Sequence, residues 1–256
     1  MNLYLSQFVS SMYSIFRKKP RLYELIPDGY VDIHSHVLPG IDDGAKTIEE
    51  TKELLGRLTS LGFSACIATP HINTGVWNNS PTIIRETYQQ TQANLDSKQP
   101  QILVHCASEY MLNETFIQTL SSEPLMTLKD NYVLIELSYV NPPLALKEII
   151  FEIQQKGYLP ILAHPERYNY YHQNLEIYDD LKNIGVLFQL NLLSTIGYYG
   201  PAVAKIADIL LKSEKIDFVG SDIHHVRHVE AFQQHLIISS TKQLQIAMAK
   251  NAIFAT

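Results

Sequence analysis

The sequence predicts an α/β fold, a distorted TIM-like barrel of about seven β/α units, from two observations. Short apolar segments alternate with helix-patterned segments along the chain, which favours parallel strands joined by right-handed crossovers. Histidine or carboxylate residues follow six of the seven apolar segments. In a barrel the carboxyl ends of the strands converge on one face, whereas an open doubly wound sheet, the alternative, would spread them along an edge.

The expected strands are short, apolar and bounded by polar or turn-forming residues. The second of them, Ser64 to Thr69, is nearly all apolar, as a strand buried on both faces should be. The expected strands span residues 30–36, 64–69, 101–107, 132–137, 159–163, 186–191 and 217–220.

Local start and stop signals mark the helices between these strands. Thr47 and Glu50 have the spacing of a capping box, a leucine stripe follows them, and Gly62 ends it. Ser80-Pro81 opens the next helix with proline at the first helical position. The expected helices span residues 47–61, 80–97, 113–120, 142–156, 174–183, 201–213 and 240 onward.

The chain divides at about residue 30. No low-complexity segment or compositional break follows this point, so residues 30–256 are expected to form a single barrel domain and residues 1–29 an N-terminal extension. The first 16 residues are apolar and aromatic and precede three basic residues, the reverse of the order in a signal peptide. Residues 1–20 are therefore either an anchor for peripheral membrane contact or an extension that packs on the domain, and Met12 is an alternative start.

Composition and charge exclude several classes of function. The chain has 256 residues, 46% of them hydrophobic, enough for a sizeable core, and no apolar run approaches the roughly 20 residues that span a bilayer. The net charge of −6 argues against a nucleic-acid-binding protein, because phosphate backbones require a basic face. Cys66 and Cys106 are the only cysteines, which predicts no disulfide framework and fits the reducing cytoplasm.

The stretch from Tyr30 to Gly44, YVDIHSHVLPGIDDG, organises the candidate site. His34 and His36 are two residues apart at the end of an apolar run, so in a strand both imidazoles project from the same face. This pair alone is weak evidence for a metal site, since His-x-His is common by chance. Its significance comes from the polar residues that end the later strands.

The polar residues at the strand ends form a set of five histidines and four carboxylates. Burying so many ionisable groups without a counter-charge is costly, and divalent metal ions supply that counter-charge. Nitrogen and oxygen donors without thiolate suit Mn, Fe or Zn better than Mg, and so many donors suit two or three ions. The set comprises His34, His36, Asp43, His71, Glu109, Glu136, His164, Asp222 and His224.

Two arginines come shortly after candidate ligands. Three divalent ions against four carboxylates would leave the site positive, so it would attract a phosphate dianion. Arg167 and Arg227 could then hold phosphate oxygens through paired hydrogen bonds. A cysteine-based phosphatase is excluded, because the loop after His105-Cys106 has Leu112 where that mechanism needs arginine.

These residues resemble a known family. The segments HSHVLPGIDDGA, ATPH, SEY, IEL, AHPERY and GSDIHH resemble the PHP (polymerase and histidinol phosphatase) superfamily. Within it they are similar to the CpsB-type manganese-dependent protein-tyrosine phosphatases of capsular and exopolysaccharide operons. The resemblance runs from about residue 30 to 225, and LPGIDDGA together with AHPERY is not generic to the superfamily.

The resemblance implies a PHP-type barrel that holds two or three metals, with manganese expected. Glu109 would bridge the first two metals, and Arg167 matches the phosphate-binding arginine of the family. Asp43 and Glu136 stand where many superfamily members have histidine, and carboxylates there fit the tyrosine phosphatase branch. The three implied ligand sets are His34, His36, Glu109 and Asp222; Glu109, Glu136 and His164; and Asp43, His71 and His224.

The implied activity is hydrolysis of phosphotyrosine on a protein, namely a tyrosine kinase of polysaccharide export. A hydroxide that bridges two metals would attack phosphorus, and Arg167 would stabilise charge on the phosphate oxygens. Asp43 or His224 could assist departure of the phenolate. Two alternatives stay open: a small-molecule phosphatase similar to histidinol phosphatase, and a metal-binding protein without catalytic activity.

Six tyrosines follow strand ends and have two interpretations. They form either a rim that receives a phosphotyrosine ring or part of the packing of the barrel. These residues are Tyr139, Tyr168, Tyr170, Tyr171, Tyr198 and Tyr199.

Overall fold

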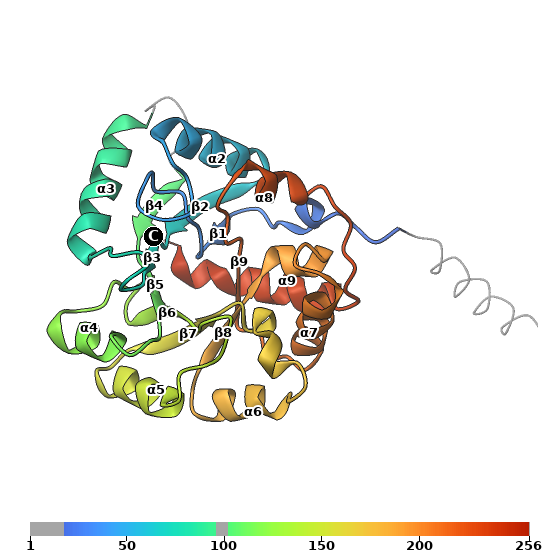
Figure 1. Cartoon of the computed structure of the whole chain (residues 1–256). Coiled ribbons are helices and arrows are strands. Elements are labelled where there is room, and N and C mark those ends of the chain that lie inside the picture. The colour runs from blue at the N-terminus through green and yellow to red at the C-terminus, as the bar shows by residue number, and fades with distance from the viewer. Residues whose placement is uncertain (1–17, 96–101, 256) are drawn as a thin grey trace, which may run out of the picture.

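The computed structural model describes residues 18–95 and 102–255 and has a mixed α/β fold with parallel sheets (Figure 1). Every pairing between named strands in these ranges is parallel. One sheet has the order β1-β2-β4 and the other the order β3-β5-β6-β7-β8-β9. The strands are β1 (Tyr30–Asp32), β2 (Phe63–Ala68), β3 (His71–Ile72), β4 (Leu103–Cys106), β5 (Glu109–Met111), β6 (Tyr132–Glu136), β7 (Leu159–Ala163), β8 (Leu187–Asn191) and β9 (Phe218–Gly220).

Two short strands that were not expected follow two of the expected ones. The strand expected over residues 64–69 is β2 and is followed, after Pro70, by β3; the strand expected over residues 101–107 is β4 and is followed by β5. Proline has no N–H to donate to a ladder, which explains an interruption there. The hydrogen bonds from Ala107 N to Ala68 O (2.8 Å) and from Glu109 N to Pro70 O (3.1 Å) carry the pairing across the gap. Residue 101, the expected start of that strand, lies outside the described residues.

The first and last strands lie next to each other beyond their regular ends. β1 stops at Asp32, earlier than expected, but Ser35 forms a parallel bridge with Ile223. His36 N donates to Ile223 O (2.8 Å), and Asp222 N donates to His34 O (2.8 Å). This contact brings the two segments richest in candidate ligands side by side.

The helices surround the strands, as Figure 1 shows for α2 to α7. Thr47 caps α2 by accepting from Glu50 N (3.2 Å), while the Glu50 carboxylate accepts from Lys46 N (2.8 Å). Ser80 caps α3 by accepting from Ile83 N (3.3 Å). The helices are α2 (Ile48–Ser60), α3 (Pro81–Asn94), α4 (Phe116–Ser122), α5 (Leu146–Gln155), α6 (Glu176–Asn183), α7 (Pro201–Lys212), α8 (Val226–Ala231) and α9 (Thr241–Lys250).

Two helical predictions need correction. The helix expected from residue 142 begins only at Leu146, so residues 137–145 form a loop after β6. Helix α8, directly after the last candidate ligands, was not expected. Its six residues are too few to show a helical period in the sequence.

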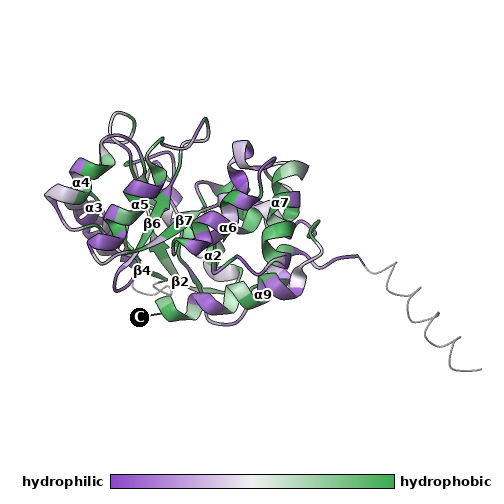
Figure 2. Ribbon diagram, turned by 90° about the horizontal axis from the view of Figure 1, so that it is seen from below, coloured by the Kyte–Doolittle hydropathy of each residue, from purple (hydrophilic) through white to green (hydrophobic). Residues whose placement is uncertain are grey.

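The core lies on both faces of the strands, whose residues are hydrophobic along most of their length (green in Figure 2). A large cluster joins the strands to the surrounding helices. A smaller cluster connects strands that are far apart in the chain. Its members include Val31, Ala65, Ile67, Leu134, Ile161 and Phe218.

Part of the N-terminal segment packs on the rest of the fold. Leu22 is fully buried, and its amide donates to Gln234 O (3.0 Å). Lys19 Nζ donates to the backbone oxygens of Ile237 (2.6 Å) and Ile238 (2.7 Å). The apolar residues that suggested a membrane anchor lie mostly outside the described ranges. Within those ranges, no helix combines the length and the apolar character needed to cross a bilayer.

We expect Asn251→Ala to lower the free energy of unfolding by about 2 to 4 kcal/mol, because it leaves buried backbone groups without partners. The Asn251 side chain is fully buried. It donates to Val31 O (2.9 Å) and Val219 O (2.7 Å) and accepts from Val219 N (3.1 Å), so it joins β1 to β9. Urea denaturation measures the loss. Exposed Asn183→Ala is the control, with a change within about 0.5 kcal/mol, and equal midpoints for the two variants would contradict the expectation.

Candidate metal centre

The structure brings all nine candidate ligands together at the carboxyl ends of the strands. Their donor atoms form four overlapping groups, and within each group these atoms lie within 4.8 Å of one another. The groups are His36, Asp43, His71 and His224; His34, His36 and Asp222; His34, Glu109 and His164; and His71, Glu109 and Glu136.

His34 and His36 are each oriented by a neighbour that sequence reasoning missed. His34 Nδ1 donates to Gln189 Oε1 (2.8 Å), and His36 Nδ1 donates to Asp42 Oδ2 (2.8 Å). In the neutral form of each ring, this bond places the proton on Nδ1 and leaves Nε2 able to bind a metal. Metal-binding histidines commonly donate their other ring nitrogen in this way.

The distances between donor atoms fit a shared cation. His34 Nε2 lies 3.2 Å from His36 Nε2, 3.1 Å from Glu109 Oε2 and 3.3 Å from Asp222 Oδ1. His36 Nε2 lies 3.4 Å from each of the two carboxylate oxygens. Ligands about 2.1 Å from one ion, at angles of 90° to 109°, would be about 3.0 to 3.4 Å apart. Nε2 of His34 and Nε2 of His36 therefore have metal-like spacing to each other and to both carboxylates, whereas Glu109 and Asp222 fall in different groups.

Glu109 stands at the middle of the centre. Its Oε1 accepts from His164 Nε2 (3.0 Å), and its Oε2 lies 3.2 Å from His71 Nδ1 as well as near His34. Burial acts to raise the pKa of Glu109, but His34 and His71 hold that pKa well below its usual range. Glu109 Oε2, His71 Nδ1 and His164 Nδ1 are buried without a hydrogen-bond partner among the described residues. Buried polar atoms of this kind need an explanation, and a bound cation accounts for Glu109 Oε2 and His71 Nδ1.

The two histidines beside Glu109 differ in their charge. Burial and then Arg167 lower the pKa of His164 to about 4, so its ring is neutral, the form that binds a metal. Burial and His36 act to lower the pKa of His71, but the nearby carboxylates raise it to about 10. One of those carboxylates is Glu136, whose Oε1 lies 2.9 Å from His71 Nδ1.

Asp43 faces the two histidines that the resemblance pairs with it. Its Oδ1 lies 3.5 Å from His71 Nε2 and 3.4 Å from His224 Nε2. Burial acts to raise the pKa of Asp43, but bonds from these histidines hold it far below the usual range. Gly44 allows the tight loop, because a Cβ there would lie 2.0 Å from His36 O.

The two carboxylate oxygens of Asp222 have different partners. Oδ1 faces His34 and His36, while Oδ2 accepts from Arg167 Nη1 (2.7 Å) and from Asn191 Nδ2 (2.9 Å). The backbone of Asp222 has a φ of 52°, in the left-handed region. Such conformations occur often at functional sites, where surrounding contacts hold them.

The two arginines have different positions. Arg167 Cζ lies 4.1 Å from the ring centroid of Tyr199 and 4.9 Å from that of Tyr139, so the guanidinium is held between two aromatic rings. Arg227 is exposed and lines a separate surface hollow with Glu50 and Glu53 of α2. The structure therefore brings Arg167 but not Arg227 to the centre, because α8 turns away from it.

The grouping differs in part from the sets implied by sequence. Glu136 lies with His71 rather than with His164, and His36 belongs to two groups. Three supporting residues, Asp42, Gln189 and Asn191, were not assigned a role. The available signal for Gln189 and Asn191 was their polarity in the otherwise apolar strand β8, and for Asp42 its position beside Asp43.

The cysteine excluded from catalysis is buried in β4. Cys106 is only 6% exposed, and burial raises the pKa of its thiol to about 11. A nucleophilic cysteine instead has a lowered pKa and an accessible thiolate.

Comparisons with known proteins identify the family of this chain. A family model described as capsular polysaccharide synthesis, CpsB/CapC, matches residues 30–244. The tyrosine-protein phosphatase YwqE of Bacillus subtilis (strain 168) is 32% identical over 198 residues, which cover 77% of this chain and 78% of that protein. The tyrosine-protein phosphatase CpsB of Streptococcus pneumoniae is 26% identical over 202 residues, which cover 77% of this chain and 83% of that protein.

A solved structure is also similar. It comes from the pair YwqE of Bacillus subtilis and CpsB of Streptococcus pneumoniae, described as unique metal-dependent tyrosine phosphatases. The TM-score is 0.73 at 28% sequence identity, over 88% of each chain. Because the family model spans most of the sequence, the chain belongs to the CpsB/CapC family of capsular polysaccharide synthesis proteins.

Proposed function

We propose that this chain is a metal-dependent protein-tyrosine phosphatase whose substrate is a phosphorylated tyrosine kinase of capsule or exopolysaccharide export. The observation that carries the proposal is the spacing of 3.1 to 3.4 Å from Nε2 of His34 and of His36 to each other and to carboxylate oxygens of Glu109 and Asp222. The names of its relatives support the reaction, since they are tyrosine-protein phosphatases.

We infer further that all nine candidate ligands hold two or three divalent ions, with manganese as the native metal. The nitrogen and oxygen donors support this choice. We also infer that the two sheets together form one closed, distorted (β/α)7 barrel over residues 30–256, because β3 and β5 continue β2 and β4 and because Ser35 pairs with Ile223. The buried, unpaired cysteines support a cytoplasmic location.

The residues of the chain have separate tasks in this reaction. Bound divalent ions would supply an activated water and neutralise charge on the phosphate. Arg167 has five N–H donors, of which one bonds to Asp222, so the others can hold phosphate oxygens. Tyr139 and Tyr199 keep its guanidinium in place between them.

The leaving group needs little help. A tyrosyl phenolate has a pKa of about 10, so it can depart without a strong general acid. Asp43 and His224 lie at the solvent side of the centre, with side chains 53% and 16% exposed. They are therefore the most exposed of the nine candidate ligands and the ones nearest to the solvent into which a phenolate would depart.

The test compares phosphate release from a phosphotyrosyl peptide and from histidinol phosphate, with and without added Mn²⁺. We expect activity that depends on Mn²⁺ and a kcat/KM at least about tenfold higher for the peptide, because Tyr139, which contacts Arg167, and Asp43 are both exposed and can be reached by a protein segment. The opposite preference would favour the small-molecule phosphatase. Metal binding without phosphate release from either substrate would identify a non-catalytic metal-binding protein.

A further inference from the structure

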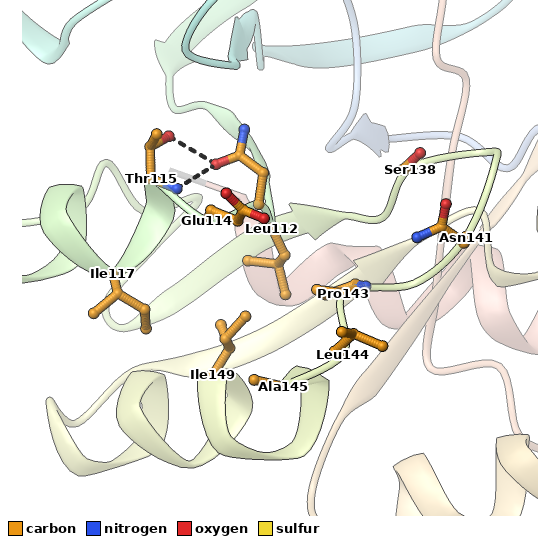
Figure 3. A pocket seen from close by; sticks show the side chains of 11 residues that line it. Leu112, Glu114, Thr115, Ile117, Ser138, Asn141, Pro143, Leu144, Ala145 and Ile149 are labelled. Carbon is orange, nitrogen blue, oxygen red and sulfur yellow. Dashed lines mark hydrogen bonds between the residues drawn. The ribbon is translucent and has the colours of Figure 1, made fainter.

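A hollow of about 760 Å³ lies beside the proposed metal centre (Figure 3). One wall comes from the segment after β5 and from α4, and the other from the loop after β6 and the start of α5. Leu112, Ile117 and Ile149 point into the space between these walls (Figure 3). The volume is in the range of sites that enclose small ligands or side chains.

The walls continue directly from strands that carry two candidate ligands. Leu112 comes three residues after Glu109, and its amide donates to Glu136 O (2.9 Å). Ser138 comes two residues after Glu136. Because an extended chain advances about 3.3 Å per residue, the hollow begins within about 7 Å of the Glu136 backbone. The hollow therefore lies at the same ends of β5 and β6 as these two candidate ligands.

Hydrogen bonds hold both walls in place. Tyr170 Oη donates to Ser138 O (2.9 Å) at the base of the loop. On the other wall, Asn113 Oδ1 accepts from Thr115 N (3.0 Å) and from Thr115 Oγ1 (2.7 Å), as the dashed lines in Figure 3 show. The hollow is therefore formed before any partner binds, which lowers the entropy loss on binding.

The rim of the hollow is apolar and unusually exposed. Leu144 is completely exposed, and Val140 in the same loop is 83% exposed. Exposed apolar patches next to a site commonly mark a contact surface. Glu114 is the one ionisable side chain that lines the hollow within the described part of the chain. Its negative charge repels phosphate, so the phosphate belongs at the metals and an uncharged group in the hollow.

We propose that this hollow receives an apolar side chain of the substrate protein, two to four residues away from the phosphotyrosine. This inference rests on the proposed phosphatase function and adds a sequence preference to it. Two to four residues of extended chain span about 7 to 13 Å, a length that covers the distance of about 7 Å from the Glu136 backbone to the start of the hollow. A neighbouring basic residue in the substrate would pair with Glu114.

The experiment uses full-length, metal-loaded protein and alanine-based phosphotyrosyl peptides. Leucine is placed at each position from two to four residues before or after phosphotyrosine, and serine replaces it in matched peptides. We expect one of the leucine peptides to have a kcat/KM about tenfold above its serine partner, through a lower KM. Leu144→Asp should remove most of that gain, while Ile246→Asp, an exposed isoleucine on α9, should retain it.

Free phosphotyrosine is assayed in parallel and reports the metal centre alone. Equal kcat/KM for all leucine and serine peptides, or a gain that survives Leu144→Asp, would overturn the docking proposal while the phosphatase function stands. A shift from dimer to monomer in Leu144→Asp with no loss of peptide preference would assign the hollow to a second copy of the chain, and would also overturn it. No hydrolysis of free phosphotyrosine by wild type would refute the phosphatase function, and this proposal with it.

Discussion

Glu109→Gln is expected to lower kcat for p-nitrophenyl phosphate by about a hundredfold to a thousandfold. Glutamine keeps the size of the side chain but removes the negative charge. Glu109 Oε2 lies between His34 Nε2 (3.1 Å) and His71 Nδ1 (3.2 Å), and Oε1 accepts from His164. The neutral amide would bind every metal ion that this side chain contacts more weakly.

The control for this variant is Glu152→Gln, an exposed residue of α5, which should keep wild-type kcat. Circular dichroism and thermal unfolding should show that Glu109→Gln folds, since glutamine has the same shape and nearly the same volume as glutamate. Wild-type turnover by a folded Glu109→Gln protein would rule out Glu109 as a bridging ligand.

Removal of divalent metal by a chelator is expected to abolish activity and to lower the unfolding temperature, and added Mn²⁺ should restore both. Without metal, buried carboxylates lie close together: burial and then the charge of Glu109 raise the pKa of Glu136. A metal at about 100 times its Kd stabilises the folded state by about 2.7 kcal/mol. Calorimetry with and without Mn²⁺ measures the shift.

Elemental analysis of the same samples tests the number of metals. We expect up to three ions per chain in wild type and one fewer in Asp43→Ala, because Asp43 Oδ1 lies between His71 and His224. Glu109→Gln serves as the comparison for stability, since its unfolding temperature should rise much less with Mn²⁺. An unchanged metal content in Asp43→Ala would reduce the centre to two ions, and an unfolding temperature indifferent to Mn²⁺ would contradict metal binding altogether.

Local patterns predicted most of the elements because each has a strong physical cause. The capping residues Thr47 and Ser80 start α2 and α3 as expected, and the apolar runs become parallel strands. The departures occur where local preference is weak. Pro142 and Pro143 were expected to open a helix, but α5 begins at Leu146, and the resulting loop forms one wall of the hollow.

The candidate ligands could be named from the sequence because they end strands that must be parallel, and such ends meet on one face. Their partners could not. Gln189 reaches His34 across 155 residues of chain, and Asn191 reaches Asp222 across 31. Contacts of this kind depend on which strands are neighbours and on the direction of each side chain. Local sequence patterns do not specify either. For Arg227 the local pattern was misleading. Its position three residues after His224 predicted a place at the centre, but α8 carries it to the surface.

The sequence by itself determined most of the strands and helices and the nine candidate donor residues, since hydrophobic period, helix caps and strand-end polarity are local properties. Its motifs also indicated the family. Only the tertiary structure decided which donors share a neighbour, which arginine reaches the centre and where an apolar hollow opens beside it. These features depend on contacts between residues far apart in the chain, which local patterns do not specify. The bridge between Ser35 and Ile223, which brings the segments of His34 and Asp222 together, is one of them.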